Sequence, residues 1–381
     1  MSDFLERTGM KGAKVAPFRD GYLIDGDIFI SEESLIERFE NANSNSKRGN
    51  ENQQAIANSY NQVSYTIGST KTITYYIGSS VPSVWETAIS DAISEWNNVK
   101  NLAFNFVESS SPSADLSFTT YNEVTSTIAF ADFPSSGEPG DQISINTYYN
   151  SNTRLSTSRK KFTIAHEMGH ALGFRHTNWQ QRNEPVNDPS KDIYGANLVA
   201  GTWNEDAVSV MNGTVSDWNG FSFLDILAFR TVYPLDDNLK PCYVYRRLTN
   251  KGYYWTTDWS EYGSYTYDSP TSTGFEYIGF NGFMYETQVS GTVPIYLYYS
   301  PGSNWYNKSK DPYIDSNFQG WNKIGIIGYA YAAAGAGRQP VHQYFHPSKG
   351  FFNTLNYNDD FVASDPNWSY NGIPYYAASV Y

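Results

Sequence analysis

The run of eleven residues from His166 to His176 carries side chains whose types and spacing suit metal chemistry. It reads His-Glu-Met-Gly-His-Ala-Leu-Gly-Phe-Arg-His. Because positions i and i+4 share one face of a helix, His166 and His170 can direct two imidazoles at one ion. Gly173 then allows the left-handed turn that ends a helix, so the chain can return and offer His176 as a third ligand. Three nitrogens with a fourth position left for water are typical of a catalytic zinc site.

Glu167 directly follows the first of these histidines and lies at the edge of the same helical face. It is badly placed to be a third ligand, but its carboxylate can reach a water molecule beside the metal. Zn²⁺ lowers the pKa of such a water and polarises a carbonyl group, while a carboxylate serves as general base. The run therefore predicts hydrolysis with Glu167 as the catalytic residue. A chance H-E-x-x-H pentad is the competing interpretation, and Gly173 and His176 count against it.

Composition excludes several other classes of function. The chain has 381 residues, of which 39 are acidic and 26 basic, and its formal net charge is −13. This charge disfavours nucleic acid and anionic membranes as partners. No stretch of the sequence is long and apolar enough to span a membrane. The single cysteine, Cys242, excludes an intramolecular disulfide framework and a thiolate zinc cluster, and we expect it to be buried.

The chain falls into three segments by composition. Residues 1–62 are interpreted as an accessory segment and linker, with a helix expected over 31–39 and a polar stretch over 41–62. Lys47-Arg48 lies in that stretch, where a trypsin-like protease could cut. The sequence pattern of residues 63–238 predicts one domain of strands and helices. Residues 239–381 hold most of the tyrosines.

The middle segment, 63–238, shows alternating strand and helix patterns. We expect strands over 72–77, 102–107, 115–120, 126–130 and 142–148. An amphipathic helix is predicted over 83–99, a second helix ends at Gly173, and a third covers 222–233 before Pro234. Ser156 or Ser158 can cap the second helix.

The last segment, 239–381, contains three similar stretches that begin near Pro241, Pro294 and Pro340, roughly 50 residues apart. Each is rich in Tyr and short strand patterns, which predicts an all-β domain of three repeats, trefoil-like or propeller-like. Exposed aromatic rings can also stack on planar partners. The sequence leaves two roles for these tyrosines: packing inside the domain, or binding of a glycan or a surface.

The metal motif, together with Met211 in the setting Ser-Val-Met, resembles the metzincins over residues 63–238. The resemblance implies an α+β fold, with a twisted mixed sheet, a metal-binding helix and a Met-turn beneath the zinc ligands. Within that group the chain is most similar to the astacins and to the bacterial dual-action HEIGH metallopeptidases. It departs from astacins at Thr177, where they have Glu, and at Gly213, where they have a Tyr that can bind the zinc.

The N-terminal segment resembles an astacin-type propeptide, in which a Gly-Asp pair places a carboxylate on the zinc and blocks it. Asp27 is the expected blocking residue, and Asp25 is the alternative. The resemblance also implies that substrate pairs as an added strand along residues 126–132, with Ala129, Phe130 and Ala131 as the substrate-binding residues.

These observations predict a zinc endopeptidase made as a latent zymogen, acting on protein or peptide substrates. The N-terminus lacks the features of a signal peptide, and we expect a secreted protein whose signal peptide is absent from this sequence, because a broad protease endangers its own cell. The alternative is an adhesion or glycan-binding protein with a vestigial protease domain. The intact Glu167 argues against that alternative.

Overall fold

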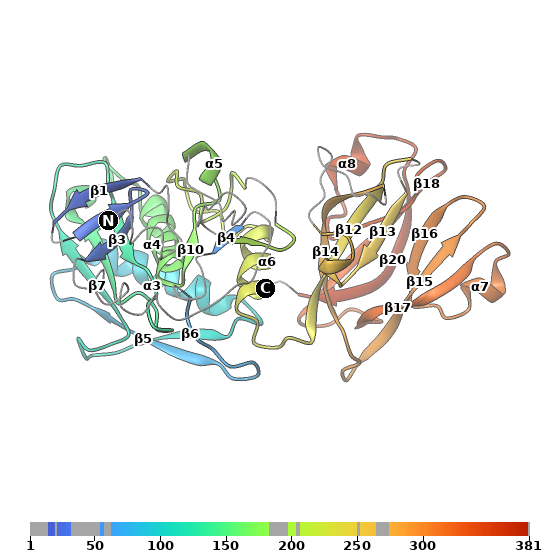
Figure 1. Ribbon diagram of the computed structural model, residues 1–381, viewed down its shortest axis with the longest axis horizontal. Helices are drawn as coiled ribbons and strands as arrows, with labels where there is room; N and C mark the ends of the chain where they lie inside the picture. Colours follow the sequence, from blue (N-terminus) through green and yellow to red (C-terminus); the bar gives the residue numbers. More distant parts are fainter. Residues whose placement is uncertain are drawn as a thin grey trace, which may run out of the picture. The chain divides into compact units, whose positions relative to one another are not determined.

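The computed structural model describes residues 14–19, 21–31, 54–56, 62–182, 197–202, 206–249, 252–263 and 274–379. The helix expected over 31–39 and the basic pair Lys47-Arg48 lie outside these residues. The chain divides into two compact units, Met1–Leu235 and Asp236–Tyr381, whose elements are labelled in Figure 1. No helix in the described parts of the chain is long and apolar enough to cross a membrane.

The first unit contains a mixed sheet with the strand order β1-β2-β3-β8-β9-β7-β5-β6. Its strands are β1 (Val15–Phe18), β2 (Gly21–Ile24), β3 (Ile28–Ser31), β5 (Lys71–Ile77), β6 (Phe104–Glu108), β7 (Leu116–Tyr121), β8 (Ala129–Asp132) and β9 (Gln142–Asn146). A smaller sheet has the order β10-β4-β11, formed by β4 (Gln54–Ile56), β10 (Phe174–Arg175) and β11 (Asn197–Val199). The helical elements are α3 (Ser83–Asn98), η2 (Thr147–Tyr149), α4 (Thr157–Ala171), α5 (Trp179–Arg182) and α6 (Phe223–Val232).

Local sequence accounts for the ends of the three longer helices. Pro82 occupies the N-cap of α3, whose apolar face buries Trp85 and Trp96. The Ser156 side chain accepts a hydrogen bond from the first turn of α4, and Gly173 at φ 95° provides the left-handed turn after that helix. Ser222 caps α6 in a reciprocal capping box. The three helices expected within residues 63–238 are thus found within a few residues of their predicted ends.

The N-terminal strands extend the sheet of the first unit rather than forming a separate body. Strands β2 and β3 form an antiparallel hairpin around a turn at Asp25-Gly26, whose φ values are 55° and 106°. Strand β3 then pairs in parallel with β8, matching Ile28 with Ala131. A buried cluster that joins the two segments consists of Leu23, Phe29, Tyr121 and Phe130. Residues 21–31 therefore cover the strand that the sequence suggested for substrate.

The second unit repeats one arrangement three times. Each repeat has a long first strand, a hairpin partner, a short helical turn and a long returning strand that pairs with the first. The repeats comprise β12 (Leu239–Arg247), β13 (Tyr253–Thr256), η4 (Trp259–Glu261) and β14 (Phe275–Tyr285); β15 (Thr292–Ser300), β16 (Trp305–Ser309), α7 (Ile314–Asn317) and β17 (Asn322–Tyr331); and β18 (Arg338–His346), β19 (Gly350–Thr354), α8 (Asp360–Ala363) and β20 (Ser369–Ala378). The returning strands β14, β17 and β20 also pair with one another. The predicted three-repeat all-β domain is confirmed.

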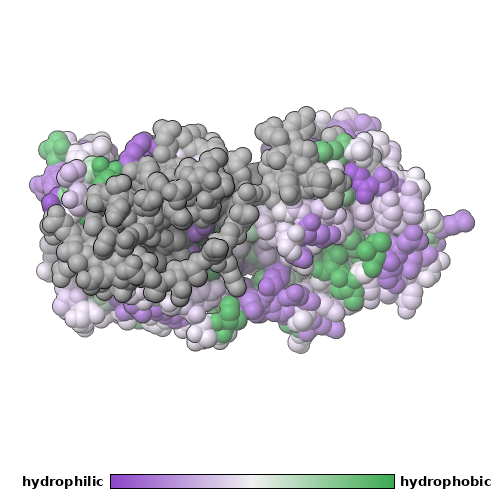
Figure 2. Space-filling model, in the orientation of Figure 1, coloured by the Kyte–Doolittle hydropathy of each residue, from purple (hydrophilic) through white to green (hydrophobic). Residues whose placement is uncertain are grey.

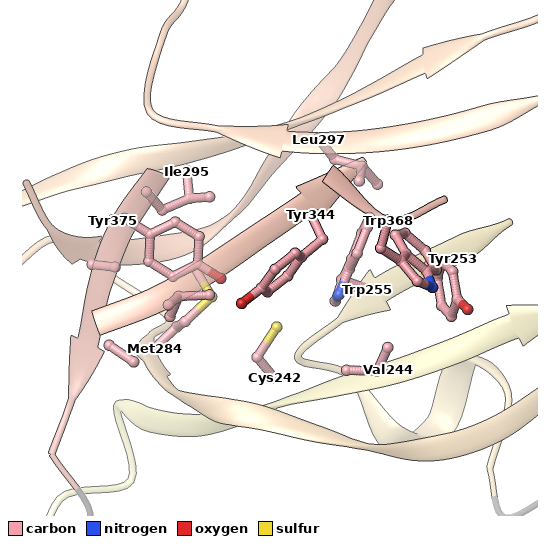
Figure 3. Packing of buried hydrophobic residues seen from close by; sticks show 13 residues of the cluster. Cys242, Val244, Tyr253, Trp255, Met284, Ile295, Leu297, Tyr344, Trp368 and Tyr375 are labelled. Carbon is pink, nitrogen blue, oxygen red and sulfur yellow. The ribbon is translucent and has the colours of Figure 1, made fainter. Parts of the chain in front are cut away.

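One hydrophobic core serves all three repeats. Figure 3 shows side chains from different strands pointing toward one another, among them Cys242 of β12, Ile295 of β15 and Tyr375 of β20. Cys242 is fully buried, as expected from the sequence. Because most large side chains of these repeats pack inward or against each other, the abundance of Tyr is explained largely by packing.

Candidate metal centre and active site

Three histidines from the predicted run meet in the first unit. His166 and His170 lie on α4, one turn apart, and their ring centroids are 4.6 Å apart. His176 follows the short strand β10, and its ring lies 5.2 Å from that of His166 and 4.8 Å from that of His170. All three are at least 95% buried. Helix periodicity positions the first pair, and the turn at Gly173 brings the third ring back to them.

The ring nitrogens are oriented for a metal ion. The Nδ1 atom of His166 lies 2.7 Å from the carbonyl oxygen of Val210, and that of His170 lies 2.7 Å from the carbonyl oxygen of Phe174. An Nδ1–H that donates to a carbonyl leaves Nε2 as the free lone pair. Nε2 of His170 is buried without a hydrogen-bond partner among the described residues. Burial holds the pKa of His170 well below its usual range, which favours the neutral imidazole that binds metal.

The carboxylate of Asp27 enters the same group. Its Oδ2 atom lies 3.1 Å from Nε2 of His176 and 3.9 Å from Nε2 of His166, and its Oδ1 atom lies 3.7 Å from Nε2 of His170. One ligand atom from each of the four residues lies within 4.8 Å of all the others. Three imidazoles and one carboxylate are a donor set that suits tetrahedral Zn²⁺.

Asp25 occupies a different place from Asp27. Its Oδ2 atom forms a buried ion pair with Nη2 of Arg175 at 2.6 Å, and its Oδ1 atom accepts a hydrogen bond from the backbone N–H of Lys14. The turn at Gly26 thus directs two neighbouring carboxylates in different directions. Of the two candidates named from the sequence, Asp27 is the one whose carboxylate lies among the histidines.

Glu167 lies beside the metal group and is 2% exposed. Its Oε2 atom is buried and has no hydrogen-bond partner in the described part of the chain. Burial, followed by the negative charge of Asp27, raises the pKa of Glu167 well above its ordinary value, although His176 opposes this shift. Burial also disfavours ionised Asp27, yet the neighbouring histidines, chiefly His176, outweigh it and hold the pKa of Asp27 well below its ordinary value. The two carboxyl groups therefore differ in their affinity for a proton.

Met211 lies beneath the metal-binding helix. Its side chain is fully buried, and a Cβ atom at Gly169 of α4 would lie only 2.2 Å from the Met211 sulfur. The preceding residue, Val210, offers its carbonyl to His166, and the Met211 carbonyl accepts from the N–H of Thr177. The turn at Met211 therefore contacts the chain on both sides of the metal group, at the place where the sequence led us to expect a Met-turn.

Asp225 of α6 holds this turn from below. Its carboxylate accepts hydrogen bonds from Ser209 Oγ at 2.5 Å, from the Val210 N–H at 2.9 Å and from the Ser222 N–H at 2.9 Å. Burial raises the pKa of Asp225 to about 6, so at neutral pH the group is largely ionised and accepts all three bonds. Sequence reasoning missed this role, although the Ser-x-x-Asp spacing at the start of the helix was a local signal of a capping box.

A cavity of about 280 Å³ opens beside the metal group. It is lined by Gly26, Asp27, Ser126, Thr127, Ile128, Ala129, Phe162, Thr163, His166, Glu167, Arg182, Asn212, Gly213 and Val215. Of the three residues predicted to bind substrate, Ala129 lines this cavity, Phe130 packs in the cluster with Phe29, and the Ala131 N–H donates to the Asp27 carbonyl. Arg182 and Arg175 were not singled out from the sequence, which contains no local signal for either.

Three buried histidines and a carboxylate, with two of the histidines on a helix beside a mixed sheet and a buried glutamate next to them, form the arrangement expected of a zinc metalloendopeptidase. The sequence model of the dual-action HEIGH metallo-peptidase family matches residues 22–233, which is more than half of the chain. The chain belongs to this family, and Zn²⁺ is its cofactor. Residues 306–378 match a domain of unknown function, DUF5648.

Solved structures provide a weaker comparison. The chain is similar to high choriolytic enzyme 1, a hatching-enzyme zinc protease from the medaka fish Oryzias latipes, with 15% identity over 48% of this chain and 98% of that one, at a TM-score of 0.32. It is also similar to myroilysin, with 19% identity over 47% of this chain and 98% of that one, at a TM-score of 0.32. No curated protein matches the chain at a significant level.

Proposed function

We propose that this zinc endopeptidase is secreted as a latent zymogen, and that its own N-terminal segment blocks the metal. The observation that carries the proposal is the Asp27 carboxylate, which lies 3.1 Å from His176 and within 4 Å of a ring nitrogen of each other histidine. A carboxylate at this place occupies the position that water needs for hydrolysis. Loss of the N-terminal segment would free that position for water.

In this proposal His166, His170 and His176 hold Zn²⁺ through their Nε2 atoms. The bound Zn²⁺ supplies a Lewis acid that polarises the scissile carbonyl and acidifies water. Glu167 then takes a proton from the attacking water, whose oxygen bonds to the carbonyl carbon, and transfers that proton to the leaving amine as the C–N bond breaks. The raised pKa of buried Glu167 suits a group that must accept and then return a proton.

Strand pairing supports the same view of latency. Strand β3 of the N-terminal segment pairs with β8 at Ala131 and Asp132, so β8 is not a free edge while the segment is present. Departure of residues 21–31 would expose the backbone groups of β8, and an extended substrate could then add as a strand there. We propose Ala129, Phe130 and Ala131 as the backbone contacts for that substrate.

The test is the activity of full-length protein before and after limited trypsin treatment, with and without a zinc chelator. We expect casein-type proteolysis only after the cut, and its loss with chelator. The variant Asp27→Ala should cleave a short fluorogenic peptide without any cut, because the metal position is then open although β3 still pairs with β8. Asp91→Ala, at an exposed position on α3, should stay latent toward the same peptide. Unchanged latency of Asp27→Ala would remove the proposed blocking role and leave the peptidase itself in place.

The reason for proposing secretion is the consequence of the activity, since a latent protease that is activated outside protects the cell that makes it. Fractionation of producing cells would test it. We expect the protein in the medium, and accumulation of the active form inside the cells would contradict the proposal.

For the second unit we propose contact with a glycan through the third repeat. Tyr357 and Tyr370 are 55% and 44% exposed, and their ring centroids lie 5.1 Å apart. Nδ1 of His342 lies 3.1 Å from the Tyr370 hydroxyl and adds a polar edge. Separately from these two rings, Figure 2 shows a group of hydrophobic residues on one face of this unit. A glycan array probed with full-length protein and with Tyr357→Ala would test this, and equal binding of both would contradict it.

A further inference from the structure

Arg182 reaches the active-site cavity across a space that only glycine leaves open. A Cβ atom at Gly213 would lie 2.5 Å from Nη1 of Arg182. The same Nη1 atom donates a hydrogen bond to the Gly213 carbonyl at 3.1 Å. Position 213 is one of the two places at which the chain departs from the astacins, which have a tyrosine there. In this protein the guanidinium group of Arg182, from α5, fills the space beside Gly213.

The position of the guanidinium relative to the metal group is defined by Asp27. Nη2 of Arg182 lies 4.0 Å from Asp27 Oδ2, and that oxygen lies 3.1 Å from Nε2 of His176. The carboxylate oxygen therefore marks a place for a negatively charged oxygen between the histidines and the arginine. Among the described residues that line the cavity, no other Lys or Arg is present. Arg182 is 25% exposed, so its charge is partly shielded from water.

Hydrolysis of a peptide creates a negatively charged oxygen beside the metal, and the position of Asp27 Oδ2 suits such an oxygen. When water adds to the scissile carbonyl, the π electron pair moves onto the carbonyl oxygen, and the oxygen stays charged until the C–N bond breaks. Hydrogen-bond donors fixed in advance around such an oxygen stabilise the transition state more than the ground state. A guanidinium keeps its charge at all working pH values and offers several donors.

We propose that Arg182 is a catalytic residue that stabilises the oxyanion of the tetrahedral intermediate once the N-terminal segment has left. In the latent form the same guanidinium donates to the Asp25 carbonyl and faces Asp27, so it also helps to anchor the segment. The proposal rests on the peptidase function proposed above. It adds a second electrophilic group beside the Zn²⁺ that the histidines would hold.

The experiment compares Arg182→Ala, Arg182→Lys and the matched control Arg159→Ala on trypsin-treated full-length protein. Arg159 lies on α4 with a side chain that is 49% exposed and an ion pair to Asp217. We expect Arg182→Ala to lower kcat about 10²–10³-fold with KM changed less than about 3-fold, as for loss of an oxyanion donor. Arg182→Lys should retain an intermediate rate, and Arg159→Ala should match the unmodified protein.

Binding of a phosphinic peptide gives a readout that does not depend on turnover. Its tetrahedral phosphorus oxyanion imitates the intermediate. Calorimetry on trypsin-treated, zinc-loaded protein should therefore show that Arg182→Ala reduces the affinity for the phosphinic peptide far more than it reduces the affinity for an unreactive product peptide. Gly213→Ala keeps the charge but displaces the guanidinium, and it should weaken phosphinate binding as well. Zinc content and circular dichroism confirm that each variant is folded and loaded.

Two results would overturn the inference. If Arg182→Ala and Arg159→Ala have equal kcat and equal phosphinate affinity, Arg182 only anchors the N-terminal segment. If Arg182→Ala raises KM and leaves kcat unchanged, it binds substrate uniformly and is not an oxyanion donor. Failure of the peptidase function looks different, because the unmodified protein and Arg159→Ala would then also show no chelator-sensitive hydrolysis.

Discussion

Two of the three histidines of the metal group are held by backbone carbonyls that fix their orientation. Backbone carbonyls of Val210 and Phe174 orient His166 and His170, so that their Nε2 atoms lie toward the Asp27 carboxylate, where the metal position is expected. Glu167 has the opposite environment, because its buried Oε2 atom has no hydrogen-bond partner in the described chain. The histidines are thus constrained to bind, while the glutamate is left available for a proton.

Replacement of the proposed general base gives the first prediction. We expect Glu167→Gln to lower kcat/KM about 10²–10⁴-fold, because an amide cannot accept the proton of the attacking water. Its zinc content should remain unchanged, since the three histidines are intact. Steady-state kinetics on a fluorogenic peptide and metal analysis provide the measurements. Glu86→Gln, at an exposed position of α3, is the control, and a fully active Glu167→Gln would refute the assignment.

At the scale of elements, α6 and the turn at Met211 form a support under the metal-binding helix. Asp225 binds Ser209 and Val210, and Val210 binds His166, so one chain of hydrogen bonds runs from α6 to a metal ligand. Tyr233 at the end of α6 donates to the carbonyl of Leu172, at the end of α4, at 2.5 Å. The turn at Met211 and helix α6 thereby hold α4 at His166 and at its C-terminal end.

The variant Asp225→Asn tests this support. Its amide offers one acceptor oxygen where three donors converge, and the resulting shift of Val210 should disturb His166. We expect zinc affinity to fall about 10–100-fold and the free energy of unfolding of the first unit to fall by about 2 kcal/mol. Competition with a chromogenic chelator and thermal unfolding measure the two effects. Asp217→Asn, whose side chain is 65% exposed, should change neither.

The second unit contains a buried cation that makes its stability depend on pH. Lys308 of β16 is fully buried, with Nζ 3.7 Å from Cys242 Sγ and 5.0 Å from the centroid of the Trp255 ring. Burial lowers the pKa of Lys308 to about 8, against the opposing effect of Cys242. The unfolded chain therefore holds more protons than the folded one between pH 8 and about 10.5. Over that window the contribution of Lys308 to the free energy of unfolding should rise with pH, whereas the raised pKa of buried Cys242 acts in the opposite direction.

We accordingly predict that Lys308→Met stabilises the second unit at pH 7 and that this advantage shrinks by about 3 kcal/mol between pH 7 and pH 10.5. A methionine fills a similar volume without a charge to desolvate. Denaturant unfolding at both pH values, compared with the exposed Lys310→Met control, measures the difference. A stability difference that is independent of pH would contradict the lowered pKa of Lys308.

At the scale of the whole molecule, the chain joins a complete peptidase unit to a β unit with its own core. The metal group, Glu167 and Asp225 all lie within Met1–Leu235, whereas the cluster around Cys242 lies within Asp236–Tyr381. Two cores with separate residues predict two separate unfolding transitions.

Removal of the metal should therefore act on one transition alone. A ligand present at about 100 times its Kd stabilises by about 2.7 kcal/mol, so chelation should lower the Tm of the first unit by roughly 5–10 °C. Differential scanning calorimetry with and without chelator measures this, and Asp225→Asn and Lys308→Met identify which transition belongs to which unit. Equal shifts of both transitions would show that the units unfold together.

The sequence by itself determined the metal centre and the outline of both units. His166, His170 and His176 lie within eleven residues, and helix periodicity with one glycine turn suffices to bring them together. The helices of the first unit and the strands of the repeats could be predicted for the same reason, since their patterns are local. Caps such as Ser156 and Ser222 set their ends.

Only the tertiary structure decided which distant residues join that centre. Asp25 and Asp27 have the same chemistry and stand two positions apart, and the turn between them, seated against β8 and Arg175, determines which one faces the histidines. Arg182 reaches the cavity because Gly213, 31 positions later, leaves it space. Contacts of this kind depend on how remote segments pack, and no local periodicity encodes them.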